Sequence, residues 1–280
     1  MGNSFKLGIC QMQVEDNKKA NLKKAREMIA EAAGRGCRLV VLPAMFNCPY
    51  RSDTFPDYAE PVPGGETSLM LARSARKEGI YLVGGSIPEN DDSGTVYNTC
   101  PVFSPAGQLI ACHRKLHLFD VDLEAGLSFR ESDTLGAGRQ VTVFSTSLAT
   151  MGVAICYDIR FPELARLMAL QGAELIVLPG AFNTITGPAH WETLLKARAI
   201  DNQVFVVGAS PALNPSASYH AWGHSLVVDP WGTVLAAAGQ DETILYAEIV
   251  PARVKQVRRE LPLLRHRRTD LYEVREISAT

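Results

Sequence analysis

Four apolar runs of strand-like composition constrain the fold of this chain more than any other feature. They span residues 5–12, 37–43, 80–87 and 173–180, and they end in prolines, glycines or polar turns. Short runs with this composition and these boundaries are typical of strands in the core of a sheet. We therefore expect a fold built around buried strands.

The segments between these runs show helical and hairpin patterns. Residues 17–36 carry apolar side chains at helical spacing and end on glycines, which predicts an amphipathic helix. Residues 98–116 and 224–237 each contain two strand-like runs joined by turn residues, which predicts two hairpins. Helices and hairpins mixed around buried strands favour a layered α/β sandwich of mixed sheets over a purely parallel sheet.

The size and charge of the chain limit the classes of partner. With 280 residues, 46% of them hydrophobic and 21% charged, the chain can bury one large core, so we expect a single domain over residues 1–280. Its 28 basic and 30 acidic residues leave a net charge of −2, which argues for neither a nucleic-acid nor a membrane partner. We expect a small-molecule substrate instead.

The N-terminal region and the cysteines favour a cytoplasmic location. The N-terminus lacks a basic region followed by an apolar stretch, and no apolar run reaches the roughly 18 residues of a membrane span, so we expect neither export nor membrane insertion. The six cysteines are scattered along a chain large enough to fold without cross-links. This pattern predicts free thiols in a reducing cytosol.

Residues 151–164 are the strongest candidate for a catalytic centre. A strand is expected to end at Cys156, and after a short polar link Pro162 and Glu163 are expected to open a helix. A thiol at such an elbow lies near a helix N-terminus, whose partial positive charge favours the thiolate. The alternative is a buried structural cysteine, which is the more common role of a single cysteine in a cytosolic protein.

Residues 111–120 are the second candidate. On an extended strand, His113, Lys115 and His117 share one face. Because a strand rises ~3.3 Å per residue, we expect His113 and His117 to lie roughly 13 Å apart, too far for one metal ion, and we predict no metal site. Lys115 is either a charged residue that protects a strand edge or an ammonium group directed at a reaction centre.

Six segments together resemble the nitrilase superfamily of carbon–nitrogen hydrolases along nearly the whole chain. They are LPAMFNCPY, HRKLHLFD, FRESDTL, CYDIRFPEL, GAFNTITGPAHWETLLKARAIDNQ and AWGHSLVVDPWG. Within the superfamily the chain is most similar to the omega-amidases, which hydrolyse the terminal amide of short dicarboxylate monoamides such as 2-oxoglutaramate. The resemblance implies a four-layer α-β-β-α sandwich, an amide substrate with a distal carboxylate, and no metal or organic cofactor.

The resemblance also assigns the catalytic residues. It places the nucleophile on Cys156, the lysine that stabilises the oxyanion on Lys115, and a second glutamate, which positions the substrate and the lysine, on Glu131. In the superfamily the residue that follows Leu-Pro in the first segment is the general-base glutamate. Here that position is Ala44, so the chain lacks its base.

Two explanations for Ala44 compete. A deliberate replacement of Glu by Ala would stall the enzyme and leave the other catalytic residues untouched, whereas a natural pseudoenzyme would more readily have lost Lys115, Glu131 or Cys156 as well. The retention of all three favours deliberate replacement. We expect strongly reduced turnover, since general-base catalysis contributes about 10²- to 10⁴-fold to rate.

The resemblance further implies the substrate contacts. Arg160 and Thr186 are expected to bind the distal carboxylate, and a guanidinium group matches a carboxylate geometrically. The alternatives are a surface ion pair for Arg160 and a helix cap for Thr186. Tyr50 and Phe182 are expected to line the pocket, although aromatic residues near strand ends are more often core. A backbone N–H near Tyr157 is expected to help stabilise the oxyanion.

Three functions remain open at this stage. The first is an omega-amidase disabled at Ala44. The second is another branch of the superfamily: a deaminated-glutathione amidase, a carbamoylase or a nitrilase. Tyr157 and Asp158 stand where nitrilases tend to carry Trp-Glu, and the NCPY and AWGHS segments match omega-amidases better than deaminated-glutathione amidases. The third is a noncatalytic protein that binds carboxylates.

The resemblance finally implies self-association. Family members associate through the helices that follow the nucleophile and the GPAHW segment, so we expect a homodimer or a higher homo-oligomer. The C-terminal arm, about residues 250–280, interleaves leucines with charged residues. Such an arm is more often an interface than an anion site, and we expect it to contribute to the contacts between subunits.

Overall fold

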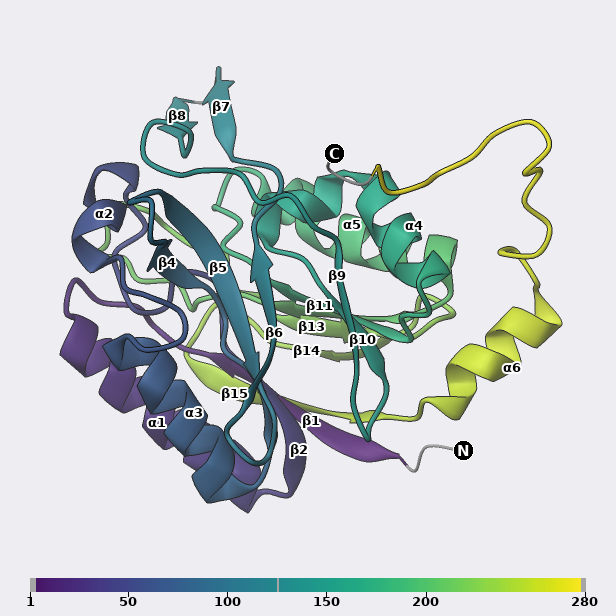
Figure 1. The fold of residues 1–280 in the computed structure, drawn as a ribbon, viewed down its shortest axis with the longest axis horizontal. Coiled ribbons are helices and arrows are strands. Elements are labelled where there is room, and N and C mark those ends of the chain that lie inside the picture. Colours follow the sequence, from purple (N-terminus) through teal and green to yellow (C-terminus); the bar gives the residue numbers. More distant parts are fainter. Residues whose placement is uncertain (1–3, 125, 278–280) are drawn as a thin grey trace.

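The structure, a computed structural model, describes residues 4–124 and 126–277, which form two large sheets between layers of helices (Figure 1). The first sheet has the strand order β15-β1-β2-β3-β5-β4, with β6 paired to β5, and the second has the order β14-β13-β12-β11-β10-β9. The strands of the first sheet are β1 (Phe5–Gln11), β2 (Cys37–Val41), β3 (Tyr81–Val83), β4 (Ile87–Asn90), β5 (Val96–Phe103), β6 (Leu109–Arg114) and β15 (Thr243–Ile249). Those of the second are β9 (Thr142–Ser145), β10 (Thr150–Val153), β11 (Leu175–Pro179), β12 (Phe205–Ala209), β13 (Leu226–Val228) and β14 (Val234–Ala237).

Helices cover the outer faces of both sheets. Helices α1 (Lys18–Gly34) and α3 (Glu66–Glu78) lie on the first sheet, and α4 (Pro162–Leu170) and α5 (Gly187–Asn202) lie on the second (Figure 1). The smaller elements are η1 (Ser52–Thr54), α2 (Phe55–Tyr58), the hairpin β7 (Asp120–Leu123) and β8 (Leu127–Arg130), η2 (Cys156–Arg160) and α6 (Ala252–Glu260). This arrangement confirms the predicted four-layer α-β-β-α sandwich. In the part of the chain that the structure describes, no helix is both long and apolar enough to span a bilayer.

Strand β2 shows why the apolar runs fold into this sandwich. Leu39 and Val41 belong to the core between the two sheets, whereas Val40 and Leu42 belong to the core beneath α1 and α3. Successive side chains of a strand point to opposite faces, so a run that is apolar at every position can be buried on both. A run that is apolar at every position therefore predicts a strand whose two faces are both covered, one by the second sheet and the other by helices.

Most of the predicted elements are confirmed. The amphipathic helix is α1, and the Asn17 side chain accepts a hydrogen bond from the backbone N–H of Ala20 at 3.1 Å, which caps its N-terminus. The two predicted hairpins are the antiparallel pairs β5–β6 and β13–β14. The expected strand at residues 80–87 is instead two strands, β3 and β4, both paired with β5.

The break between β3 and β4 positions the loop that contains Ala44. Gly85 has a φ of +63°, and a Cβ atom there would lie 2.2 Å from the carbonyl oxygen of Pro43. Only glycine fits such a close approach in this backbone conformation. Beyond it, the backbone N–H of Ser86 donates to the Pro43 carbonyl at 3.2 Å, and the Ser86 hydroxyl accepts from the Met45 N–H at 3.1 Å.

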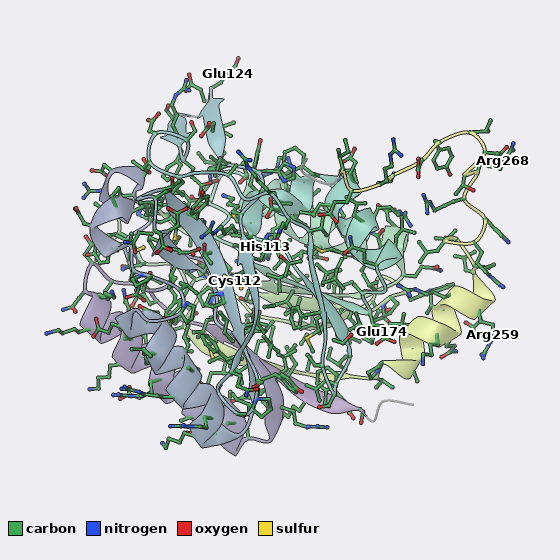
Figure 2. All side chains as sticks on the ribbon, viewed as in Figure 1. Cys112, His113, Glu124, Glu174, Arg259 and Arg268 are labelled. Carbon is green, nitrogen blue, oxygen red and sulfur yellow. The ribbon has the colours of Figure 1, made fainter. Side chains whose placement is uncertain are left out.

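The C-terminal arm extends from α6 along the outer edge of the molecule. Figure 2 shows Arg259 on α6 and Arg268 on the arm at this edge. The arm returns toward the body of the protein, where the Glu276 carboxylate accepts hydrogen bonds from the Val141 N–H at 3.1 Å and from Gln171 at 3.0 Å. Leu271 on the arm is 70% exposed. The predicted role of the arm in self-association stays a prediction.

Candidate active site

Cys156 lies at a sharp turn between β10 and α4. The strand ends at Val153, earlier than expected, and Cys156 opens the short helix η2 with a φ of +48°. A non-glycine residue with this backbone conformation is strained, and such strain is concentrated at functional sites. The thiol is buried, and its sulfur accepts a hydrogen bond from the Ala181 N–H at 3.4 Å.

The environment of Cys156 does not favour the thiolate, so the expectation from the helix N-terminus is wrong. Burial raises the pKa of the thiol above its ordinary value, and the nearby positive charge of Lys115 offsets this only in part. The physical reason is that η2 separates Cys156 from the N-terminus of α4 and the surrounding protein excludes water. The thiol therefore needs a proton acceptor to react.

Lys115 lies just beyond the end of β6 and is completely buried. Its backbone N–H donates to the Asn98 carbonyl at 2.8 Å, and its ammonium group forms an ion pair with Glu131. Burial by itself lowers the pKa of Lys115, but the charges of Glu131 and Cys156 and the hydrogen bond to Glu131 together outweigh burial and raise it. A buried, permanently charged ammonium is not the exposed residue that protects a strand edge, so that alternative is wrong.

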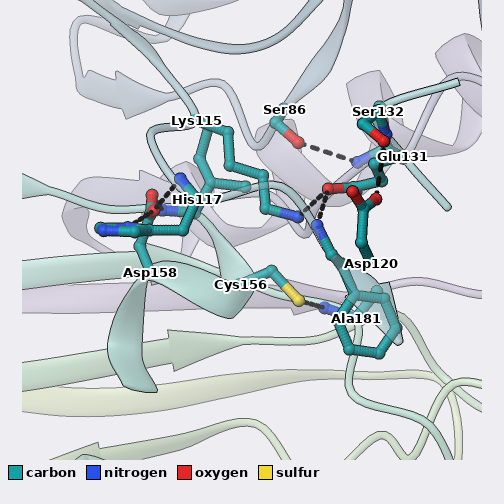
Figure 3. A network of polar contacts seen from close by, with 12 residues as sticks. Ser86, Lys115, His117, Asp120, Glu131, Ser132, Cys156, Asp158 and Ala181 are labelled. Carbon is teal, nitrogen blue, oxygen red and sulfur yellow. Dashed lines mark hydrogen bonds and ion pairs between the residues drawn. The ribbon is translucent and has the colours of Figure 1, made fainter. Parts of the chain in front are cut away.

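Glu131 uses both carboxylate oxygens to hold the site together. One oxygen accepts from the Tyr50 hydroxyl at 3.1 Å, and the other accepts from the Phe119 N–H at 2.8 Å and from Lys115. Figure 3 shows Lys115, Glu131 and Cys156 gathered in one site. Because Glu131 already has three donors, it is poorly placed to take the proton of the Cys156 thiol.

Ala44 lies in the same neighbourhood and contributes no polar side-chain atom. It is 1% exposed and lines a cavity of about 30 Å³, together with Tyr50, Ala181 and Tyr219. Tyr50 bonds Glu131, and Ala181 bonds Cys156, so the cavity adjoins both ends of the site. A volume of this size is comparable with the share of about one water molecule in the liquid.

A buried carboxylate links the cysteine turn to the lysine segment. One carboxylate oxygen of Asp158 accepts hydrogen bonds from the His117 N–H at 2.9 Å and from the His117 ring at 2.8 Å. The other oxygen accepts from the Ile155 N–H at 2.9 Å and contacts the His113 ring at 3.3 Å. Burial alone raises the pKa of Asp158, but these partners outweigh it and hold the pKa well below its usual range. Asp158 thus stays ionised and fixes Cys156 relative to Lys115.

The expected separation of the two histidines is wrong. Both rings contact the two oxygens of one carboxylate, so they cannot lie 13 Å apart. The prediction assumed a continuous strand, whereas β6 ends at Arg114 and the chain turns back toward Asp158. In residues 4–124 and 126–277 no group of three or more His, Cys, Asp or Glu side chains has the arrangement to hold a metal ion.

Arg160 projects from the end of η2 next to the cysteine. Its guanidinium group lies 4.6 Å from the centre of the Phe182 ring and 5.7 Å from that of Tyr157, and one nitrogen contacts the His190 ring at 3.1 Å. Burial lowers the pKa of Arg160, and the nearby Cys156 opposes this shift. No carboxylate of the described residues pairs with Arg160, so the surface ion pair is not formed.

The other predicted pocket residues lie on the loops around this centre. Thr186 is at the N-cap position of α5, but its hydroxyl forms no cap and instead donates to the Asn183 side chain at 3.2 Å. Phe182 is buried between Arg160 and Trp191. The backbone N–H of Tyr157 has no acceptor among the described residues, which leaves it available to a ligand.

Sequence reasoning missed several residues of the site. Tyr219 packs against Tyr50 with ring centres 4.5 Å apart, and its hydroxyl donates to the Ala181 carbonyl at 2.5 Å. His190 contacts Arg160, and Asn183 holds Thr186. His190 and Asn183 stand in the GAFNTITGPAHW segment, so their polar side chains near Thr186 could have identified them from the sequence. Tyr219 lies in a loop that has no recognisable motif, and nothing in the sequence marked it.

The site geometry and the sandwich together define a class of protein, the carbon–nitrogen hydrolases. The model of the carbon-nitrogen hydrolase family matches residues 6–259, and the chain belongs to this family. It is 50% identical to omega-amidase NIT2 from Danio rerio over 98% of this chain and 99% of that protein, and 49% identical to omega-amidase NIT2 from Homo sapiens over 97% and 98%. The crystal structure of Saccharomyces cerevisiae Nit3, a member of branch 10 of the nitrilase superfamily, superposes with a TM-score of 0.88 at 43% identity, covering 95% of this chain and 97% of Nit3.

Proposed function

We propose that this chain is an amidase of the omega-amidase type whose turnover is strongly reduced by Ala44. It binds the monoamide of a short dicarboxylic acid, such as 2-oxoglutaramate or succinamate, and its chemistry is hydrolysis of the terminal amide to the acid and ammonia. The similarity to omega-amidases supports the reaction. The observation that carries the substrate class is Arg160, a half-buried guanidinium group beside Cys156 without a carboxylate partner in the described residues.

The proposed reaction proceeds through a thioester on Cys156. The thiolate attacks the amide carbon, and Lys115 and the backbone N–H of Tyr157 stabilise the negative charge that develops on the carbonyl oxygen. The leaving nitrogen takes up the proton that the thiol lost and departs as ammonia, and water then hydrolyses the thioester to the acid and the free thiol. Glu131 keeps Lys115 charged and in place rather than exchanging protons itself, because its oxygens are already bonded.

Both half-reactions need a proton acceptor that this chain lacks. The first step must remove the proton of a thiol whose pKa is raised by burial, and the second must deprotonate water. A glutamate at position 44 would extend toward the cavity between Tyr50 and Ala181 and serve both steps. With Ala44 the substrate still binds, because Lys115 and the guanidinium group of Arg160 remain. It is hydrolysed slowly, because no base removes the protons.

The test uses the Ala44→Glu variant and three amides, two with a distal carboxylate and one without. We expect Ala44→Glu to release ammonia from 2-oxoglutaramate and succinamate much faster than from butyramide, which lacks the distal carboxylate. The double variant Ala44→Glu/Cys156→Ala is the matched control and should release none. Equal rates on succinamate and butyramide would exclude the omega-amidase assignment in favour of another amidase of the superfamily.

The second candidate is a noncatalytic carboxylate-binding protein, which the absence of a polar side chain at position 44 favours. This candidate predicts that succinamate binds to the chain but that Ala44→Glu still releases no ammonia. The variant therefore distinguishes an amidase that has lost only its base from a protein whose site has no catalytic competence.

A further inference from the structure

The loop between β11 and α5 holds an asparagine whose side-chain orientation is fixed. Asn183 is 4% exposed, and its side-chain oxygen accepts hydrogen bonds from the backbone N–H groups of Ile185 at 3.0 Å and Thr186 at 2.8 Å. The Thr186 hydroxyl is a third partner at 3.2 Å. Backbone N–H groups can only donate, so the atom that faces them must be the oxygen and not the amide nitrogen.

The amide nitrogen of Asn183 therefore faces the opposite direction, and it has no acceptor among the described residues. Buried polar groups are almost always paired, because an unpaired donor loses its bonds to water without replacement. An unpaired N–H in an otherwise bonded side chain is thus a candidate for a contact with a ligand.

The surroundings of Asn183 place this donor in the wall of the active site. The neighbouring Phe182 carries the Arg160 guanidinium group above its ring. Burial, followed by the charge of Cys156, raises the pKa of Tyr219, and hydrogen bonding from the Asn183 side chain opposes this shift. The amide nitrogen therefore faces the Tyr219 phenol without reaching the geometry of a full hydrogen bond, and because it carries two hydrogens it can donate to a ligand as well. That phenol bonds Ala181, whose N–H in turn bonds the Cys156 sulfur.

Thr186 is less suited to bind a carboxylate than its position suggests. A hydroxyl group has one proton, and the Thr186 proton is directed to the Asn183 oxygen, which cannot donate. Only lone pairs of Thr186 remain for other partners, and these repel a carboxylate. The donor that is free at this end of the site belongs to Asn183.

We propose that the side-chain amide nitrogen of Asn183 donates a hydrogen bond to the distal carboxylate of the substrate, alongside Arg160, and that Thr186 is a positioning residue that holds Asn183. This assignment rests on the proposed function, since it presupposes a carboxylate at this end of the site. It makes Asn183 a determinant of specificity that leaves the chemistry of Cys156 unchanged.

The test measures binding by isothermal titration calorimetry to the chain with Ala44, which needs no turnover. The probes are succinamate and its uncharged analogue butyramide. Asn183→Asp keeps the oxygen that accepts from the loop and replaces the free donor with a second oxygen of a negatively charged group. We expect it to weaken succinamate binding at least tenfold, as loss of a hydrogen bond to a charged group costs about 10- to 150-fold. Butyramide binding should change less than about twofold.

Thr186 variants provide a second, independent measurement. Thr186→Val removes one of the three contacts that orient Asn183 and should weaken succinamate binding by a smaller factor, about three- to tenfold, while Thr186→Ser retains the hydroxyl and should restore it. A loss with Thr186→Val as large as with Asn183→Asp would overturn the assignment, because Thr186 would then contact the carboxylate directly.

Two further outcomes separate this assignment from the proposed function. If Asn183→Asp weakens succinamate and butyramide equally, Asn183 is structural and only the present assignment fails. If the unaltered chain binds succinamate no more tightly than butyramide, the site does not recognise a carboxylate, and both the assignment and the proposed function are overturned.

Discussion

Cys156 occupies a site that opposes its own ionisation. The thiol is buried among apolar groups. Of the two cations that lower its pKa, Lys115 has the larger effect and Arg160 the smaller, and Lys115 is paired with Glu131, whose negative charge raises the pKa. As the proposed nucleophile, Cys156 would be activated in this environment only when an adjacent base removes its proton. At the residue scale, we therefore expect the absence of a carboxylate at position 44 to matter more than the presence of the other proposed catalytic residues.

The first prediction concerns the reactivity of Cys156 toward iodoacetamide. Its pKa lies above the ordinary value of 9.0, so the thiolate is a minor species at pH 7. The thiolate fraction, and with it the alkylation rate, should rise about tenfold per pH unit from pH 7 to 9. Peptide mass spectrometry measures this rate, and Cys112 is the internal control, since burial raises its pKa to about 12 and its rate should rise with pH in the same way. A rate that stays constant between pH 7 and 9 would show that the thiol is already ionised.

The second prediction concerns Arg160 in the Ala44→Glu background, which we expect to be active. Arg160→Met removes a charge-assisted contact worth ~1.5–3 kcal/mol, together with the contact of the guanidinium group with the Phe182 ring, but keeps an apolar side chain of similar length. Activity on succinamate should fall about 10- to 150-fold, mainly through KM, whereas activity on butyramide should change little. Steady-state ammonia release measures both. Equal losses on the two amides would show that Arg160 has a structural role.

At the scale of elements, the break between β3 and β4 couples the first sheet to the loop after β2. A Cβ atom at Gly85 would meet the backbone oxygen of Pro43 at 2.2 Å, whereas one at Gly94, also in the left-handed region, would meet nothing within 4 Å. This difference gives the third prediction. Gly94→Ala should cost only the backbone strain of ~1–2 kcal/mol.

Gly85→Ala should cost about 1–3 kcal/mol more than Gly94→Ala, because the Pro43 backbone must also move. Urea unfolding measures the free energy of both variants. In the Ala44→Glu background Gly85→Ala should in addition reduce ammonia release, since position 44 follows Pro43 directly. Equal free energies of unfolding would mean that the close approach imposes no constraint on the loop.

The same elements show how much of the structure the sequence predicts. Continuous apolar runs and the helical spacing of residues 17–36 are local signals, so β1, β2, β11, α1 and both hairpins were predictable. The break at Gly85 was not, because it depends on contact with Pro43 in the loop that follows β2. The turn after Arg114 that brings His113 and His117 to Asp158 was missed for the same reason: its partner is more than 40 residues away.

The candidate site likewise has features that the sequence predicts and features that depend on the whole fold. Cys156, Lys115, Glu131 and Ala44 were predicted from their motifs, and the structure brings them into one neighbourhood. The pKa of Cys156 was predicted in the wrong direction, because burial is a property of the whole fold and not of the local turn. Tyr219 has no motif of its own and joins the site only through the packing of a loop against Tyr50.

At the scale of the whole molecule, the fourth prediction is that the chain forms a homodimer or a higher oligomer. Leu271 and Tyr272 on the arm are 70% and 54% exposed, and large exposed apolar side chains of this kind are enriched at interfaces. Sedimentation at micromolar concentration should show a dimer or larger. The double variant Leu271→Glu/Tyr272→Glu should shift it toward the monomer, whereas Trp231→Ser, which changes an exposed residue of the β13–β14 hairpin, should not. A monomer for the unaltered chain would contradict this prediction.

We propose that this molecule retains a complete amidase site except for its general base. The most direct test is the ratio of kcat/KM for ammonia release from 2-oxoglutaramate between Ala44→Glu and the unaltered chain, measured at pH 7. We predict a ratio of about 10²- to 10⁴-fold in favour of Ala44→Glu, with the upper end favoured because two steps lack the base. A ratio near one, with ammonia released equally fast by both chains, would contradict the account.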